Sequence, residues 1–139
     1  MFERGKIRNE AYASILKNFT GLRRHRNITP TDIDGILEYN GKAFIILEGK
    51  FGNTQMPRGQ QKCFESICNA IESGGKTACC IVFSHLAKPG DQIDVSNCIV
   101  TKVYFENKWH HGAKNDTNRT VLQVVEAFEQ NLIKKGIDI

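Results

Sequence analysis

Two apolar runs rich in β-forming residues flank Asn40-Gly41, and this stretch constrains the fold more than any other. The runs cover Ile33–Tyr39 and Lys42–Leu47. Asn-Gly between runs of this kind is the strongest short-range signal for a β-hairpin that a sequence offers. The chain is therefore predicted to contain an antiparallel strand pair around which the other elements pack.

Charged residues occupy the open end of this hairpin, far from its turn. Asp32 and Asp34 begin the first strand, and Glu48 and Lys50 end the second. Charges at the ends of buried strands rarely occur without a partner or a function. We therefore interpret this end of the hairpin as the candidate functional site.

The register of the hairpin decides whether the carboxylates can meet, because side chains alternate between the two faces of a sheet. An unbulged two-residue turn would pair Asp34 with Leu47. The two aspartates and Glu48 would then lie on opposite faces, since a shift of one residue moves every side chain to the other face. A metal site that uses both strands would fail in that register.

A bulge in the hairpin removes this obstacle. A three-residue loop with Gly41 in the left-handed position of a G1 bulge pairs Glu38 with Lys42. Asp32 then lies opposite Glu48, and the second aspartate is its diagonal neighbour. We therefore predict this bulged loop, or a bulge elsewhere in the hairpin.

Length and composition are those of an ordinary single-domain protein. The chain has 139 residues and a net charge of +4, so we expect one domain over residues 1–139 with its own core. This charge permits a nucleic-acid partner without requiring one. No apolar run has the length of a membrane span, and the N-terminus lacks the apolar stretch of a signal peptide. We expect a cytoplasmic protein that does not contact a membrane.

The cysteines are predicted to be reduced residues of the hydrophobic core. Their number is odd, and no pair has the C-x-x-C spacing of a zinc ribbon. All of them lie in apolar segments: Cys63, Cys68, Cys79, Cys80 and Cys98. This pattern fits neither a disulfide framework nor a structural zinc site.

The N-terminal segment Glu3–Phe19 has the periodicity of an amphipathic helix that ends before Gly21. Glu10 on this helix is either a further carboxylate of the site or a solvated surface residue. The apolar stripe consists of Ile7, Ala11, Ile15, Leu16 and Phe19.

The chain after the hairpin predicts two more helices and two more strands. One helix begins near Pro57 and ends at Ser73, and Gln60 in its first turn points along the buried face. The other predicted elements are a buried strand over Ala78–Phe83, a strand over Cys98–Phe105, a loop over Asn107–Asn118 and a helix over Thr120–Lys135. With a short strand before the hairpin, this order indicates an α/β fold whose mixed central sheet is flanked by helices.

Alternation within Cys98–Phe105 assigns its residues to two faces of that sheet. Val100, Lys102 and Tyr104 are predicted to share one face, and Ile99, Thr101 and Val103 the other.

Two groups of basic and aromatic residues could contact nucleic acid. The densest positive run contains Arg23, Arg24 and Arg26, and is either a solvated connector or a phosphate clamp. In the predicted loop, Lys108 is a candidate phosphate contact, and Trp109 either stacks on bases or caps the core. Both pairs of alternatives remain open from the sequence.

The charged end of the hairpin has the composition of a magnesium site. Mg²⁺ prefers oxygen ligands, uses one or two carboxylates and keeps water and substrate phosphate at its other positions. Asp34 and Glu48 would supply the carboxylates, and Gly49 a backbone carbonyl oxygen. Lys50 could orient the attacking water or stabilise negative charge at the reacting phosphate. Further candidate ligands are Asp32 and Glu10.

The pattern Pro30-x-Asp32-x-Asp34-Gly35 … Glu48-Gly49-Lys50 … Gln60 resembles the motif of the PD-(D/E)XK nuclease superfamily. The resemblance extends over roughly Glu10 to Ser84. It implies a restriction-endonuclease-like αβββαβ core, with Asp34 and Glu48 as metal ligands and Lys50 as the catalytic lysine. Gly49 stands where the family commonly has an apolar β-branched residue.

Gln60, with Phe64 four residues later, is similar to the Gln-x-x-x-Tyr motif of the exonuclease-like and RecB-like branches. The small size also resembles stand-alone members such as structure-specific endonucleases and Holliday-junction resolvases, which commonly form homodimers. The resemblance therefore implies a Mg²⁺-dependent deoxyribonuclease of repair or recombination, with Mn²⁺ as a substitute and DNA as its partner.

Two other functions are compatible with the same residues. One is a catalytically silent nucleic-acid-binding module on the same fold, and the other is a protein-interaction domain with a solvated ion pair. The intact set of Asp34, Glu48 and Lys50 argues against the silent module, because a silent copy has no physical reason to keep charges at a strand end.

Overall fold

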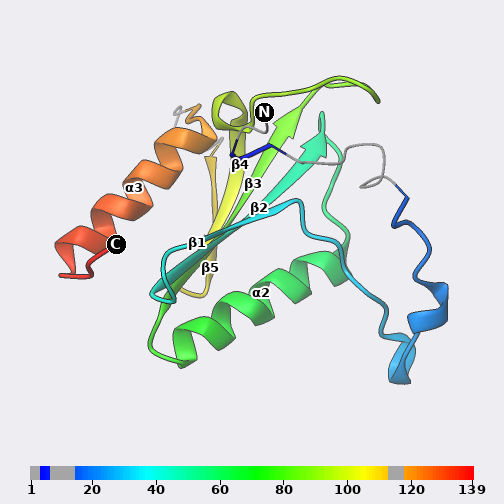
Figure 1. Cartoon of the computed structure of the whole chain (residues 1–139), viewed down its shortest axis with the longest axis horizontal. Helices are drawn as coiled ribbons and strands as arrows, with labels where there is room; N and C mark the ends of the chain where they lie inside the picture. The colour runs from blue at the N-terminus through cyan, green and yellow to red at the C-terminus, as the bar shows by residue number, and fades with distance from the viewer. Residues whose placement is uncertain (1–3, 7–14, 113–117) are drawn as a thin grey trace. The chain divides into compact units, whose positions relative to one another are not determined.

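The computed structural model describes residues 4–6, 15–112 and 118–139. Contacts within the chain divide it into two units, Met1–Asp32 and Ile33–Ile139. The second unit contains a five-stranded sheet and the helices α2 and α3 (Figure 1).

The described part of the first unit contains two 3-10 turns, Thr20–Leu22 and His25–Asn27. The helix predicted over Glu3–Phe19 is wrong for its described end, because residues 15–19 are not helical. All described side chains of this unit are exposed, and an apolar stripe without a packing partner stabilises a helix poorly. The short strand predicted before the hairpin is also not found among the described residues. Glu10 lies outside them.

The sheet of the second unit is mixed, and its strands lie in chain order from β1 to β5. β2 and β3 are parallel, and all other neighbours are antiparallel. The strands are β1 (Gly35–Glu38), β2 (Ala43–Phe51), β3 (Thr77–His85), β4 (Ile99–Phe105) and β5 (Lys108–His111). The parallel relation of β2 and β3 follows from the helix that connects them.

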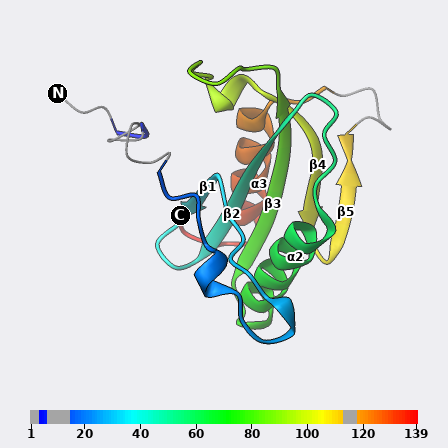
Figure 2. The same ribbon diagram turned by 90° about the vertical axis from the view of Figure 1, so that its right-hand side faces the viewer.

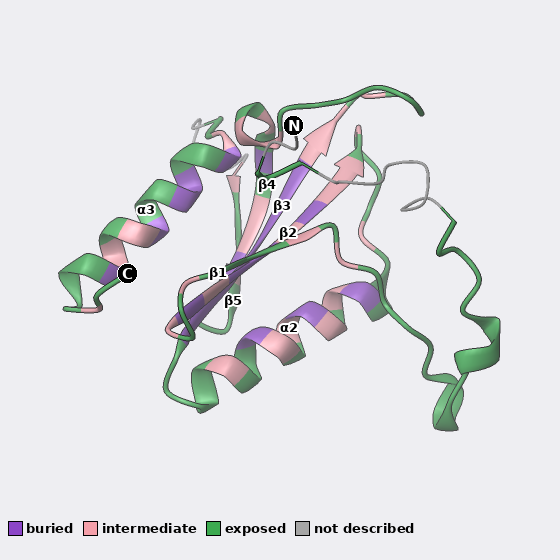
Figure 3. Ribbon diagram, viewed as in Figure 1, coloured by how far each residue is buried: buried purple, intermediate pink, exposed green. Residues whose placement is uncertain are grey.

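Helices α2 (Arg58–Ser73) and α3 (Val121–Lys134) lie on opposite faces of the sheet (Figure 2). On one face, α2 buries Phe64 and Cys68 against a core that includes Ile46. On the other face, α3 buries Phe128 and Leu132 in a separate core. Figure 3 shows the buried residues of both helices turned towards the strands. We refer to these as the α2 face and the α3 face of the sheet.

Strand β3 lies in the middle of the sheet, and its residues from Thr77 to Phe83 are buried. This confirms the prediction of a strand covered on both faces, which an apolar run without alternation indicates. All five cysteines are free; Cys68, Cys79 and Cys80 are buried, and Cys63 and Cys98 are partly buried.

The β1–β2 hairpin contains a bulge, but its register differs from the predicted one. Lys42 N donates to Tyr39 O at 2.9 Å, and Tyr39 N donates to Ala43 O at 2.9 Å. Lys42 and Ala43 therefore both lie opposite Tyr39, which is the arrangement of a bulge. Glu38 consequently pairs with Phe44 and not with Lys42.

The turn residues explain this difference. Asn40 and Gly41 both have positive φ, 53° and 76°, as a tight two-residue turn requires. The extra residue is thus Lys42, which lies directly before β2 and not within the two-residue turn. Gly35 pairs with Leu47, so the next residues outwards, Asp34 and Glu48, lie opposite each other. Asp34 thus takes the place that was predicted for Asp32.

A second bulge, in β4, changes which residues share a face. Val82 pairs with Lys102, whereas Phe83 pairs with Val100, so Thr101 is the extra residue. Val100 therefore packs in the core of the α3 face, while Lys102 faces α2. The prediction that Val100 and Lys102 share a face is wrong, because strict alternation does not hold across a bulge.

Strand β5 forms within the segment that was predicted to be a loop. It pairs with β4 through a turn at Glu106 and Asn107, whose φ angles are 51° and 66°. Hairpin turns of this type usually contain glycine, so the sequence Glu-Asn carries little turn signal.

The second unit is thus an α/β structure with a five-stranded mixed sheet between two helices. Among the described residues, no helix has both the length and the apolar character needed to cross a membrane.

Candidate active site

The end of β2 and the first turn of α2 bring three polar side chains together on the α2 face. Gln60 Nε2 donates to Glu48 Oε2 at 2.8 Å. Lys50 Nζ lies 3.0 Å from the same oxygen and donates to Gln60 Oε1 at 2.6 Å. Glu48 and Lys50 meet because residues two apart on a strand share a face. Gln60 reaches them because it lies on the buried side of α2.

Glu48 is a buried carboxylate with an incomplete set of partners. The residue is 3% exposed, and Oε1 has no hydrogen-bond partner among the described residues. Burial raises the pKa of Glu48, and the negative charge of Asp34 raises it further, whereas Lys50 and Gln60 act to lower it. A buried carboxylate oxygen without a partner is costly unless a cation or donor completes the site.

Asp34 lies at the open end of the hairpin, directly before β1. Its Oδ2 accepts a hydrogen bond from Gly49 N at 2.7 Å. This bond ties the aspartate to β2, beside Glu48. The negative charge of Asp34 acts on Glu48, and two neighbouring carboxylates repel each other unless a positive charge lies between them.

Gly49 is required by the packing of the neighbouring strand. A Cβ atom at this position would lie 2.7 Å from Cε2 and 2.9 Å from Cζ of Phe83. Phe83 is the direct partner of Gly49 in β3 and is buried in the core of the α3 face. The ring of Phe83 therefore occupies the space of the β-branched side chain that the resembled family commonly carries here.

The residues present fit a magnesium ion. The unpartnered Oε1 of Glu48 and the carboxylate of Asp34 are hard oxygen ligands of the kind that Mg²⁺ prefers, and one or two carboxylates suffice for such a site. The described residues contain no cluster of three or more His, Cys, Asp or Glu with metal-binding geometry. The remaining positions would therefore belong to the Gly49 carbonyl, water and substrate.

A second polar network lies beside this cluster on the same face. Lys102 Nζ donates to Gln61 Oε1 at 2.9 Å and lies 4.4 Å from the centroid of the Trp109 ring. Glu65 Oε2 accepts hydrogen bonds from Gln61 Nε2 at 3.2 Å and from Trp109 Nε1 at 2.6 Å. Burial lowers the pKa of Lys102. Sequence reasoning missed Glu65 and Lys102, because their contacts with Trp109 depend on β5, which was predicted to be a loop.

The other predicted site residues lie in β5 or in the first unit. Trp109 packs against Tyr104, with 5.1 Å between ring centroids, so the structure favours its role as a cap of the core. Lys108 is exposed at the start of β5. Asp32 ends the first unit, which also contains the exposed basic residues Arg23, Arg24 and Arg26.

No protein-family model, curated protein or solved structure matches this chain. The chemistry of the site therefore rests on its own residues.

Proposed function

We propose that the chain is a Mg²⁺-dependent deoxyribonuclease that hydrolyses DNA phosphodiester bonds. The observation that carries this proposal is the buried Glu48 carboxylate, which has one unpartnered oxygen and lies beside Asp34 and Lys50. A purely structural ion pair would not need a second carboxylate at the same place.

Each residue of the cluster has a distinct role in this proposal. Glu48 and Asp34 would hold the metal ion, with the Gly49 carbonyl as a further ligand. Bound Mg²⁺ polarises a phosphodiester and lowers the pKa of a coordinated water. Gln60 forms hydrogen bonds with both Glu48 and Lys50, and so fixes the orientation of both side chains.

Lys50 is suited to contact the reacting phosphate. Its ammonium group has three N–H donors, and its contacts with Glu48 and Gln60 use two of them. The third donor can orient a water molecule or stabilise charge on a phosphate oxygen. The side chain is 17% exposed, so the group can reach a ligand while its position remains fixed.

The start of α2 adds a favourable field for a phosphate. The helix begins after Pro57 without a side-chain cap, and its first turn contains no acidic residue. Helix N-termini attract anions through free N–H groups and the helix dipole. The DNA backbone would thus approach where β2 ends and α2 begins.

Arg23, Arg24, Arg26 and Lys108 would contact DNA phosphates outside the reacting centre. A cytoplasmic homodimer that acts on branched or damaged DNA in repair or recombination is consistent with the family that the sequence resembles.

Cleavage assays with labelled linear, flapped, branched and single-stranded DNA test the proposal. The wild-type protein should cut at least one form with Mg²⁺ or Mn²⁺, and EDTA should stop the reaction. Glu48→Gln and Lys50→Gln should each lower the rate by about 100-fold or more. Glu126→Gln and Lys134→Gln, which change exposed residues of α3, are the matched controls and should retain full activity.

Three outcomes contradict the proposal. Cleavage that persists in EDTA rules out the metal mechanism. Metal-stimulated DNA binding without cleavage of any form indicates a silent binding module. If neither binding nor cleavage occurs, the charged cluster serves another purpose, such as an interaction with protein.

A further inference from the structure

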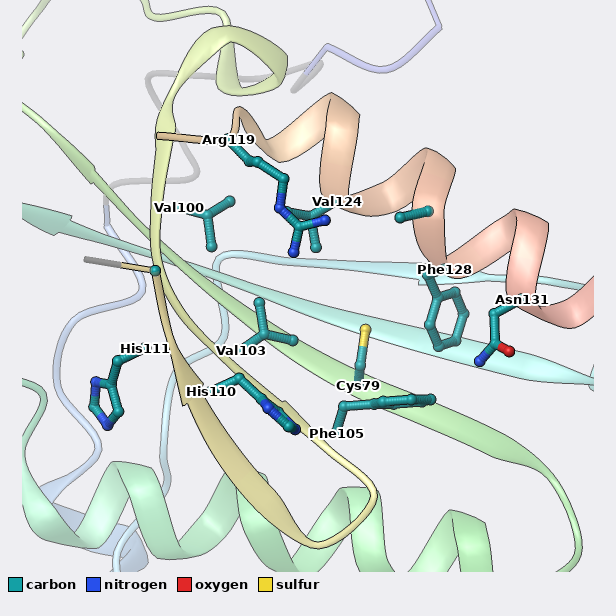
Figure 4. A pocket seen from close by; sticks show the side chains of 12 residues that line it. Cys79, Val100, Val103, Phe105, His110, His111, Arg119, Val124, Phe128 and Asn131 are labelled. Atoms are coloured by element: carbon teal, nitrogen blue, oxygen red, sulfur yellow. The ribbon is translucent and has the colours of Figure 1, made fainter. Parts of the chain in front are cut away.

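The two faces of the sheet are filled differently beyond their helices. Five strands spaced about 4.8 Å apart form a sheet wider than one helix, whose diameter is about 10 Å. On the α2 face, Trp109 from β5 packs against Tyr104 and occupies the space beside the helix. On the α3 face, the next residue of β5 is His110, opposite Val103. A cavity of about 340 Å³ remains there between α3 and the strands β4 and β5 (Figure 4).

The interior of this cavity is apolar and its edge is polar. Val100 and Val103 of β4 and Phe128 of α3 line the interior. Val100 is available for this purpose because the β4 bulge turns it to the α3 face. Arg119, just before α3, and Asn131, about three turns further along, lie at opposite ends of the cavity, and Figure 4 shows the Arg119 guanidinium group extending over the cavity beside α3.

Charge selects the kind of molecule that fits. Among the described lining residues, the charged or chargeable nitrogen groups belong to Arg119 and two histidines, and no acidic side chain is present. Arginine is always protonated and binds carboxylates through paired N–H donors. A volume of about 340 Å³ lies within the range of small-molecule pockets, which are mainly apolar with a few convergent polar groups.

We propose that this cavity binds a small molecule with an apolar body and one carboxylate group. The apolar body contacts Val100, Val103 and Phe128, and the carboxylate pairs with Arg119. His110 from β5 and Asn131, towards the other end of α3, add further polar groups to the lining (Figure 4). The site lies on the α3 face, so it does not depend on the proposed nuclease centre on the α2 face.

Decanoate is a suitable probe, because it combines an unbranched apolar body with a carboxylate. Displacement of the fluorescent apolar anion anilinonaphthalene sulfonate should report its binding to the full-length protein. Decylamine, which has the same body with the opposite charge, should not displace the dye. Arg119→Gln should weaken decanoate binding by about tenfold, since a charge-assisted pair is lost. Arg58→Gln, at an exposed arginine of α2, is the matched control and should leave it unchanged.

The location of binding is tested by NMR on the wild-type protein. Saturable decanoate-induced amide shifts should concentrate on β4 and α3 around Val100, Val103 and Phe128. Three results would each overturn the proposal. Decylamine could displace the dye as well as decanoate does, Arg119→Gln could bind decanoate as tightly as Arg58→Gln and the wild type, or the amide shifts could lie elsewhere. Neither measurement depends on nuclease activity, so failure of one proposal is distinguishable from failure of the other.

Discussion

Burial favours the protonated form of Glu48, because the carboxylate is shielded from water and Oε1 has no hydrogen-bond partner among the described residues. Its pKa is raised above the ordinary value of 4.5, so the folded state binds a proton more tightly than the unfolded state. The contribution of protonated Glu48 to stability is fully present below about pH 4.5 and is lost as pH rises through the folded pKa. Ionised Glu48 therefore carries a free-energy cost at neutral pH that a bound cation would offset.

The metal-free Glu48→Gln variant should show the pH dependence of this cost. The free energy of unfolding of the variant, relative to that of the wild type, should increase between pH 4.5 and 7, because only the wild type carries the ionised group. Urea unfolding in EDTA measures the difference at each pH. A constant or decreasing difference over this range would contradict the burial effect. Added Mg²⁺ at pH 7 should raise the Tm of the wild type more than that of the variant.

Gly49→Ala tests the close contact between β2 and β3. The added methyl group would lie under 3 Å from the Phe83 ring, which is held in the core of the α3 face. We expect a loss of about 1–3 kcal/mol in the free energy of unfolding, as for other overpacked cores. In a Phe83→Leu background, Gly49→Ala should cost less than it does in the wild type, because the ring that it would contact is gone. Urea unfolding measures all four proteins.

Gly35→Ala is the matched control for this prediction. Gly35 is in β1, and its added Cβ would have its nearest contact with Leu47 at 3.7 Å, an ordinary packing distance. The substitution should leave the stability within about 0.5 kcal/mol of the wild type or raise it slightly. Equal effects at the two glycines would show that Phe83 does not restrict position 49.

At the scale of elements, α2 connects the candidate active site to the β4–β5 hairpin. Gln60 contacts the end of β2, while Gln61 and Glu65 contact Lys102 and Trp109 of the hairpin. One helix therefore fixes both groups, and loss of its contacts to the hairpin should loosen that hairpin first.

Glu65→Ala tests this connection. The variant leaves the indole N–H of Trp109 without its acceptor and removes a partner of Gln61. We expect a loss of about 1–3 kcal/mol in stability and a red shift of tryptophan fluorescence as the ring becomes more solvated. Glu126→Ala, at an exposed position of α3, should change neither quantity. An unchanged emission spectrum in Glu65→Ala would contradict the proposed contact.

The sequence was sufficient to predict the elements that depend on local pattern. Apolar periodicity predicted α2 and α3, a continuous apolar run predicted β3, and Asn40-Gly41 predicted the hairpin. The position of Gln60 followed from helical spacing. The pairing of Glu48 with Lys50 followed from the alternation of a strand.

Bulges and weak turns limited what the sequence could predict. One extra residue at Lys42 set Asp34 in the place predicted for Asp32, and one at Thr101 moved Val100 to the other face. A bulge can be placed at several points of a strand with similar local cost, so it is chosen by packing and not by local sequence. The network of Trp109 could not be predicted either, because it needs β5, whose turn at Glu106 and Asn107 carries little sequence signal.

At the scale of the whole chain, the second unit should fold without the first. Both cores and all five strands come from Ile33–Ile139, and the described residues of Met1–Asp32 bury no side chain. A protein truncated to Ile33–Ile139 should therefore melt cooperatively, with a Tm within a few degrees of the full chain. Circular dichroism measures this, and a broad transition without cooperativity would contradict it.

Anomalous scattering from crystals soaked in Mn²⁺ would show whether the unpartnered oxygen of Glu48 is a metal ligand. We expect a peak at coordination distance, about 2.0–2.3 Å, from Glu48 Oε1 and the Asp34 carboxylate. The same soak of Glu48→Gln crystals should give no peak there. A wild-type crystal with no peak between Glu48 and Asp34, at Mn²⁺ concentrations that saturate ordinary carboxylate sites, would contradict this role of Glu48.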